Sequence, residues 1–285
     1  MPPLPLVDSH VHLWDPTRFR MPWLDGNATL DRPYGLADYR SHSERVDVEG
    51  IVYLQVEVSP AYALLKARWV AELGEEGPPV LGIVPWAPVE DGERARSFLD
   101  ALVQIDPRIT GVRRLYQAEP DAEFAVRPDF IRGVRLLAEY GLSFDLGTTH
   151  RQLPATIQLV RACPDVSFVL DHLGKPNIQG GELEPWRTLI AELAALPNVW
   201  CKLSGMATEA DRGRWTIDDL RPYGEHILAS FGVDWVMFGS DWPVVLMASP
   251  YRRWVETAEA LTAGLSADAQ RKLWRDNARR FYRLS

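Results

Sequence analysis

The sequence predicts an α/β protein, a closed (β/α)8 barrel formed as a single domain over residues 1–285. Short apolar, β-branched runs recur along the whole chain, and segments with the helical spacing of apolar residues lie between them. Eight such runs favour parallel strands that close into a barrel. The alternative, a doubly wound open sheet, is disfavoured because no Gly-x-Gly-x-x-Gly motif follows the first run.

The predicted strands are short and evenly distributed. In chain order they occupy residues 5–13, 51–57, 80–86, 110–116, 142–147, 167–172, 199–205 and 235–241. The predicted helices occupy residues 61–74, 91–104, 127–140, 152–162, 184–196, 217–230 and 251–263, and a last helix spans 267–282. In 127–140, for example, Ile131, Val134 and Leu137 repeat at the spacing of one helix face.

The segment 14–45 departs from this pattern, because it predicts a long excursion after the first strand. Loops of that length inside a compact domain are usually functional. This one carries Trp14, Trp23, Arg32 and Tyr34. No linker, low-complexity tract or internal repeat interrupts the chain, which supports one domain.

Composition narrows the class of protein. The chain has 46% hydrophobic and 25% charged residues, which is typical of a globular protein. Its formal net charge of -8 counts against nucleic acid or an anionic membrane as a partner. The two cysteines have no framework spacing, and no run is apolar enough to span a bilayer. Without a recognisable leader, a cytoplasmic location is expected, and self-association into a homo-oligomer stays open.

Titratable residues gather where the predicted strands end. In a (β/α)8 barrel the active site lies at the carboxyl ends of the strands. The interiors of the runs are apolar, whereas their ends carry His10 and His12, then Arg113, Arg114 and Gln117, then His150, Asp171 and His172, then Lys202 and Ser204, and finally Asp241. Such a convergence on one rim predicts an enzyme.

The pair His10 and His12 is the sharpest of these signals. Side chains at positions i and i+2 of a strand point to the same face, so both imidazoles would aim at one point. Such a pair can hold a metal or a polarised substrate. The alternative is a pair of partly exposed histidines in an N-terminal turn.

Four stretches, in order, resemble the amidohydrolase superfamily: DSHVHLWDP, VLDHLGKP, WCKLSG and FGSDWPV. More narrowly, they resemble its sugar-lactone and dicarboxylate-lactone hydrolases, the branch of L-fuconolactonase, L-rhamnono-lactonase and 2-pyrone-4,6-dicarboxylate lactonase. The resemblance covers essentially the whole chain. It implies hydrolysis of a cyclic ester, opening an aldonolactone of a deoxy or L-sugar to its acid. The rival hypotheses are a metal-dependent decarboxylase or amide hydrolase on the same barrel, and a non-catalytic binding barrel.

The resemblance also implies catalytic roles for four residues. Asp241 matches the aspartate that takes a proton from the attacking water. His10 and His12 match the pair that ligates a divalent ion or polarises the carbonyl, and His172 matches a histidine facing the same centre. Water needs a base or a metal to attack at neutral pH, and the oxyanion then needs nearby donors or an ion.

Whether a metal takes part is left open. One Zn2+ on His10, His12 and Asp241 suits nitrogen and oxygen ligands, and members of this branch are thought able to work without one. A bridged two-metal centre is not expected, because strand four ends in Arg113 and Arg114 instead of a lysine, and a guanidinium does not ligate metal.

Seven residues near the strand ends are candidates for substrate binding: Trp14, Trp23, Arg113, Gln117, His150, Lys202 and Trp242. Each has a structural alternative. The tryptophans could belong to the core, and Lys202 could form a buried pair with Asp171 or another acid. Alternation points Arg113 into the site, where a structural salt bridge is the alternative, and turns Arg114 toward the helices. The turn after strand two, with Glu57 before Ala61 and Tyr62, departs from the family pattern and leaves the substrate open.

Overall fold

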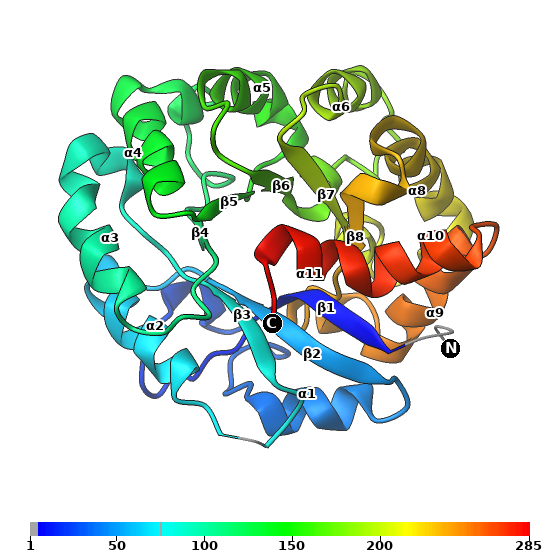
Figure 1. The fold of residues 1–285 in the computed structure, drawn as a ribbon. Helices are drawn as coiled ribbons and strands as arrows, with labels where there is room; N and C mark the ends of the chain where they lie inside the picture. Colours follow the sequence, from blue (N-terminus) through cyan, green and yellow to red (C-terminus); the bar gives the residue numbers. More distant parts are fainter. Residues whose placement is uncertain (1–4, 75) are drawn as a thin grey trace.

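The computed structural model describes residues 5–74 and 76–285, and it confirms the (β/α)8 barrel (Figure 1). Eight parallel strands surround the axis: β1 (Leu6–Val11), β2 (Val48–Leu54), β3 (Val80–Val84), β4 (Gly111–Arg113), β5 (Ser143–Leu146), β6 (Phe168–Leu170), β7 (Val199–Leu203) and β8 (Val236–Phe238). The strands pair in chain order within two sheets, β1-β2-β3 and β4-β5-β6-β7-β8. Parallel bridges Ile83–Ile109 and Val11–Trp242 join the two sheets and close the barrel.

The helices form an outer ring around the strands (Figure 1). They are α1 (Leu36–Ser43), α2 (Ala63–Ala71), α3 (Arg96–Val103), α4 (Pro128–Glu139), α5 (Leu153–Ala162), α6 (Trp186–Ala194), α7 (Met206–Glu209), α8 (Ile217–Phe231), α9 (Tyr251–Thr262), α10 (Ala267–Arg271) and α11 (Asn277–Tyr282). Among the described residues, no helix is both long and apolar enough to cross a membrane.

Most predicted elements are found at or within a few residues of their expected positions. The predicted last helix, 267–282, is continuous, but a π-helical turn at Lys272–Asp276 joins α10 to α11. Two helices were not predicted. α1 lies inside the 14–45 excursion, where its mixed polar composition hides a helical period, and α7 is a single turn after β7.

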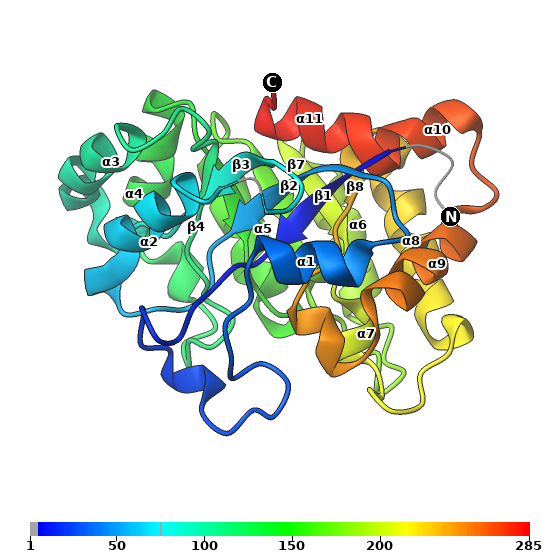
Figure 2. The same ribbon diagram turned by 90° about the horizontal axis from the view of Figure 1, so that it is seen from below.

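The barrel has a closed end and an open end (Figure 2). At the amino ends of the strands, α11 lies across the barrel, and its Phe281 and Tyr282 pack with the interior side chains Val52, Val169 and Met237. The excursion after β1 extends from the opposite end, where the strands finish (Figure 2). The barrel is therefore plugged at the amino ends of its strands, which leaves the carboxyl ends as the place for a pocket in its interior.

Candidate active site

A pocket of about 440 Å³ opens at the carboxyl ends of the strands. We call it the main pocket. Its polar lining includes His12, Arg113, Gln117, His172, Lys175 and Asp241, and its apolar lining includes Trp23 and Met247. The sequence-predicted rim is therefore a real concave site, of the size that small-molecule sites usually have.

Three imidazoles and one carboxylate converge at the floor of this pocket. The Oδ1 atom of Asp241 lies 3.1 Å from His12 Nε2, 3.6 Å from His10 Nε2 and 3.7 Å from His172 Nε2. The two Nε2 atoms of His10 and His12 are 3.2 Å apart. All four side chains are buried. The structure thus brings together the four residues predicted to be catalytic.

Local backbone geometry aims these groups. His10 and His12 share a face because they are two residues apart on and just after β1. The Asp241 backbone N–H donates to the His10 carbonyl at 2.9 Å, which ties the end of β8 to β1. His172 and Asp241 have left-handed backbones, with φ of 51° and 60°. Non-glycine residues adopt this region at a cost, and such residues cluster at functional sites.

The glycines of two quoted motifs make room for the floor. A Cβ on Gly205 of WCKLSG would lie 2.5 Å from His172 Nδ1. A Cβ on Gly239 of FGSDWPV would lie 2.8 Å from the Cβ of His10. Both approaches are too close for a side chain, so these motifs need glycine in order to pack the backbone against the imidazoles.

A buried charge network supports the floor from below. Lys202 Nζ lies 2.5 Å from Asp145 Oδ2 and 3.0 Å from Asp171 Oδ1. Arg113 Nη1 donates to Asp171 Oδ2 at 3.0 Å and to His10 Nε2 at 3.2 Å. His10 Nδ1 faces Asp171 Oδ1 at 3.3 Å. Two cations thus balance two carboxylates, and their contacts fix the His10 ring.

Burial sets the charge states of the floor. It lowers the pKa of His10 and His12 well below the ordinary value and that of His172 to about 4, so all three rings are neutral at pH 7. Burial raises the pKa of Asp241, and the nearby His172 reduces the size of that increase. Burial alone would raise the pKa of Asp171, but Lys202 holds it well below its usual range.

Three of the seven predicted substrate-binding residues line the main pocket: Trp23, Arg113 and Gln117. Trp23 is 40% exposed, and its Nε1–H donates to the Glu57 carbonyl at 2.9 Å. Arg113 faces the site, as alternation predicts, although it also forms the predicted salt bridge. Arg114, which alternation was expected to turn toward the helices, also lines the main pocket, where it pairs with Glu90 at 2.7 Å and with Glu119 at 2.8 Å.

The other four lie elsewhere. Lys202 has no exposed surface, and the buried pair with acids that was its alternative describes its position. Trp14 and Trp242 are fully buried, so they are core residues that support the pocket from behind. His150 lines a neighbouring cavity, where its Nδ1–H donates to the Lys175 carbonyl at 2.7 Å. Lys202, Trp14 and Trp242 are therefore too deeply buried to contact a substrate directly, whereas His150 lies beside the neighbouring cavity.

Sequence reasoning missed two groups of polar residues near the floor. Glu57 and Lys175 line the main pocket. The LGKP stretch after His172 was the available signal for Lys175. Behind the wall, Lys66 of α2 and Gln55 after β2 are buried, and neither Lys66 Nζ nor the side-chain amide of Gln55 makes a hydrogen bond to any described residue. Lys66 reads as an exposed helix residue in the sequence, so nothing predicted its burial.

Lys66 supports a prediction about stability. Burial and, to a smaller extent, the positive charge of the neighbouring Arg113 lower its pKa to about 7. Between this pKa and the unfolded value of ~10.4, the unfolded chain binds the extra proton, so this group makes stability rise with pH across that window. We expect Lys66→Met to raise the free energy of unfolding by ~1–4 kcal/mol at pH 7. The gain should shrink toward pH 10, measured by urea denaturation, and a gain independent of pH would contradict this assignment.

The donor set of the floor fits a divalent cation. The Nδ1–H of His12 donates to the Leu54 carbonyl at 2.9 Å, so the Nε2 of the neutral ring carries a lone pair. That lone pair faces the Asp241 carboxylate at 3.1 Å, an arrangement of two acceptors that a cation between them would stabilise. His10, His12 and Asp241 place one ligand atom each within 4.8 Å of one another. Nitrogen and oxygen ligands of this kind suit Zn2+.

Comparison with known proteins agrees with this geometry. An L-fucono-1,5-lactonase of Burkholderia multivorans is 32% identical over 98% of this chain and 96% of its own length. One of Burkholderia ambifaria is 30% identical over 98% and 95%. A crystal structure of an amidohydrolase from Burkholderia multivorans with bound zinc matches at a TM-score of 0.87 and 29% identity, covering 99% of this chain and 100% of the other. The model of the amidohydrolase family matches residues 7–284, and this chain belongs to that family.

Proposed function

We propose that this protein is a lactonase that opens a sugar lactone to its aldonic acid, with Asp241 as the general base. The observation that carries the proposal is the meeting of the Asp241 carboxylate with three neutral imidazoles at the floor of an open pocket. The two similar L-fucono-1,5-lactonases support the choice of a cyclic ester as substrate.

The chemistry follows from the charge states. Asp241 is the carboxylate at the floor and can accept a proton from water, and burial raises its pKa above the ordinary value, which strengthens it as a base. The water oxygen forms a bond to the lactone carbonyl carbon as its proton passes to Asp241. The bond from that carbon to the ring oxygen then breaks, and the proton passes from Asp241 to that oxygen, leaving a hydroxyl and a carboxylic acid that ionises.

The oxyanion of the intermediate needs a positive partner. His12 cannot donate to it, since its Nε2 carries no proton when Nδ1 donates to Leu54. Arg113 lines the pocket and is always charged, so its guanidinium can supply a donor on the carbonyl side. A divalent ion held by His10, His12 and Asp241 would polarise the carbonyl and lower the pKa of water.

The sugar specificity rests on the upper part of the main pocket. Trp23 offers a ring face at the mouth, and Gln117, Glu57 and Lys175 offer donors and acceptors for hydroxyl groups. Sites that read hydroxyls by hydrogen bonds discriminate strongly between related substrates. We therefore expect turnover of a few epimers in a panel of aldonolactones, measured by acid release with a pH indicator. Equal rates for every epimer would contradict hydroxyl recognition at this pocket.

Metal binding can be tested without an activity assay. We expect calorimetric titration of the metal-free protein with Zn2+ to show one site per chain. His12→Ala should weaken that binding by at least about 100-fold, because loss of even an outer partner of a ligand costs 10–100-fold. His226→Ala is the matched control, since His226 lies on α8, outside the pocket, where its Nε2–H donates to the Arg187 carbonyl at 2.8 Å. Equal affinity in the His12 and His226 variants would exclude this site.

A further inference from the structure

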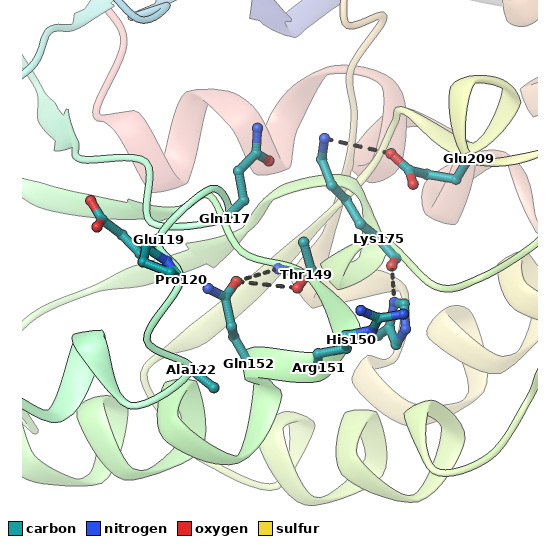
Figure 3. Close-up of a pocket in the computed structure, with 10 residues that line it drawn as sticks. All are labelled: Gln117, Glu119, Pro120, Ala122, Thr149, His150, Arg151, Gln152, Lys175 and Glu209. Atoms are coloured by element: carbon teal, nitrogen blue, oxygen red, sulfur yellow. Dashed lines mark hydrogen bonds and ion pairs between the residues drawn. The ribbon is translucent and has the colours of Figure 1, made fainter.

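A second cavity of about 350 Å³ adjoins the main pocket (Figure 3). We call it the side chamber. Gln117, Glu119 and Lys175 line both cavities, so the two lie next to each other with these side chains at their boundary. The remaining polar lining of the side chamber comes mainly from Thr149, His150 and Arg151 at the start of α5 and from Glu209 of α7. Each cavity alone reaches the ~300–1,000 Å³ range of small-molecule sites.

The junction between the two cavities is built around Lys175. Its backbone is left-handed, with φ of 49°, three residues after His172 of the floor. His150 Nδ1–H donates to the Lys175 carbonyl at 2.7 Å and holds this backbone in place (Figure 3). The Lys175 ammonium lies 3.5 Å from Glu209 Oε1 (Figure 3), and Gln117 lines the same two cavities. A ligand that extends from the floor into the side chamber would pass the side chains of Gln117, Lys175 and Glu209.

The side chamber is lined by both hydrogen-bond donors and acceptors. Its two acids are already paired, Glu119 with Arg114 at 2.8 Å and Glu209 with Lys175. Arg151 and the Gln117 side chain make no hydrogen bond or ion pair to any described residue, so their polar atoms are available to a ligand. Mixed and mostly neutralised groups suit a hydroxylated ligand, which both donates and accepts, better than an apolar chain or a strong anion.

We propose that the side chamber binds a second sugar unit, so that the substrate is the lactone of an oxidised disaccharide. This inference rests on the proposed lactonase activity and names its substrate class. The lactone ring lies in the main pocket with its carbonyl at Asp241, and the glycosyl unit passes Lys175 into the side chamber. Gln117 and Lys175 contact the link between the two units, and Arg151 contacts the outer sugar.

The test compares two lactones that differ only by the outer sugar, such as glucono-1,5-lactone and maltobiono-1,5-lactone. A second pair of the same kind has a lactone ring derived from galactose. We expect the wild-type kcat/KM to be higher for the glycosylated lactone of at least one pair by about tenfold, the factor of one or two hydrogen bonds. Ala122→Phe, which fills the side chamber, and Arg151→Ala should each lower this ratio. Ala191→Phe and Arg161→Ala, at exposed positions away from the chamber, should leave the ratio unchanged.

The outcomes separate the two proposals. Hydrolysis of the simple lactones with no preference for a glycosylated one would overturn the inference and leave the proposed function standing. A preference that survives both Ala122→Phe and Arg151→Ala would overturn the place assigned to the outer sugar. No hydrolysis of either class by folded, zinc-loaded protein would overturn the proposed function and this inference with it.

Discussion

Asp241→Asn should lower kcat/KM for lactone hydrolysis by about 10²–10⁴-fold, the contribution of a positioned general base. The amide has nearly the shape of the carboxylate but cannot accept the proton of the attacking water. It also places an uncharged group beside the three Nε2 atoms that now face the Asp241 oxygen. Initial rates of acid release at saturating and limiting substrate measure the loss.

Two controls make that loss interpretable. Asp218→Asn changes the same chemistry on α8, where the side chain is 87% exposed, and should leave kcat/KM unchanged. The Asp241 variant should unfold at a urea concentration close to that of the wild type. A folded Asp241→Asn protein with full activity would remove this residue as the base.

Lys202→Met should destabilise the protein by ~3–5 kcal/mol, as expected when one partner of a buried ion pair is removed. Lys202 has no exposed surface and lies between two carboxylates, 2.5 Å from Asp145 and 3.0 Å from Asp171. Without it, Asp171 keeps Arg113, whereas the side-chain partner that Asp145 keeps among the described residues is the hydroxyl of Tyr282, at 2.6 Å. Urea denaturation followed by circular dichroism measures the loss.

A second variant keeps this prediction testable if the first one does not fold. Lys202→Met combined with Asp145→Asn removes one charge of each sign and leaves the Arg113–Asp171 pair, so the double variant should recover stability relative to Lys202→Met. Arg161→Met is the matched control on the surface, because its pair with Glu192 is half exposed and is worth at most ~1 kcal/mol. A loss in Lys202→Met no larger than that of the control would contradict the buried network.

The sequence predicted the barrel and the floor because both follow from local rules. Alternation along β1 places His10 and His12 on one face, and the carboxyl ends of parallel strands must meet at one rim with His172 and Asp241. The chemistry of these residue types then suggests their use. The helix α1 was missed because its mixed polar sequence shows no clear apolar period, although Gly35 directly precedes it.

The sequence does not predict how deeply each side chain is buried below the rim. Lys202 and Arg113 both end strands, yet Lys202 is sealed under the floor by Tyr282 of the C-terminal helix, a contact between residues far apart in the chain. Trp14 and Trp242 stand beside polar motifs, but tertiary packing buries them completely. The side chamber depends on loops after β4, β5, β6 and β7 together, and no single stretch of sequence signals it.

The most direct test of the proposed function compares one cyclic ester with its nitrogen analogue. Zinc-loaded protein would be given L-fucono-1,5-lactone and, separately, the corresponding lactam, and carboxylate formation would be followed by NMR. We predict ring opening of the lactone well above the spontaneous rate, with no detectable opening of the lactam. Lactam opening at a similar rate, or an unchanged lactone, would contradict a lactonase and favour an amide hydrolase or another activity of this barrel.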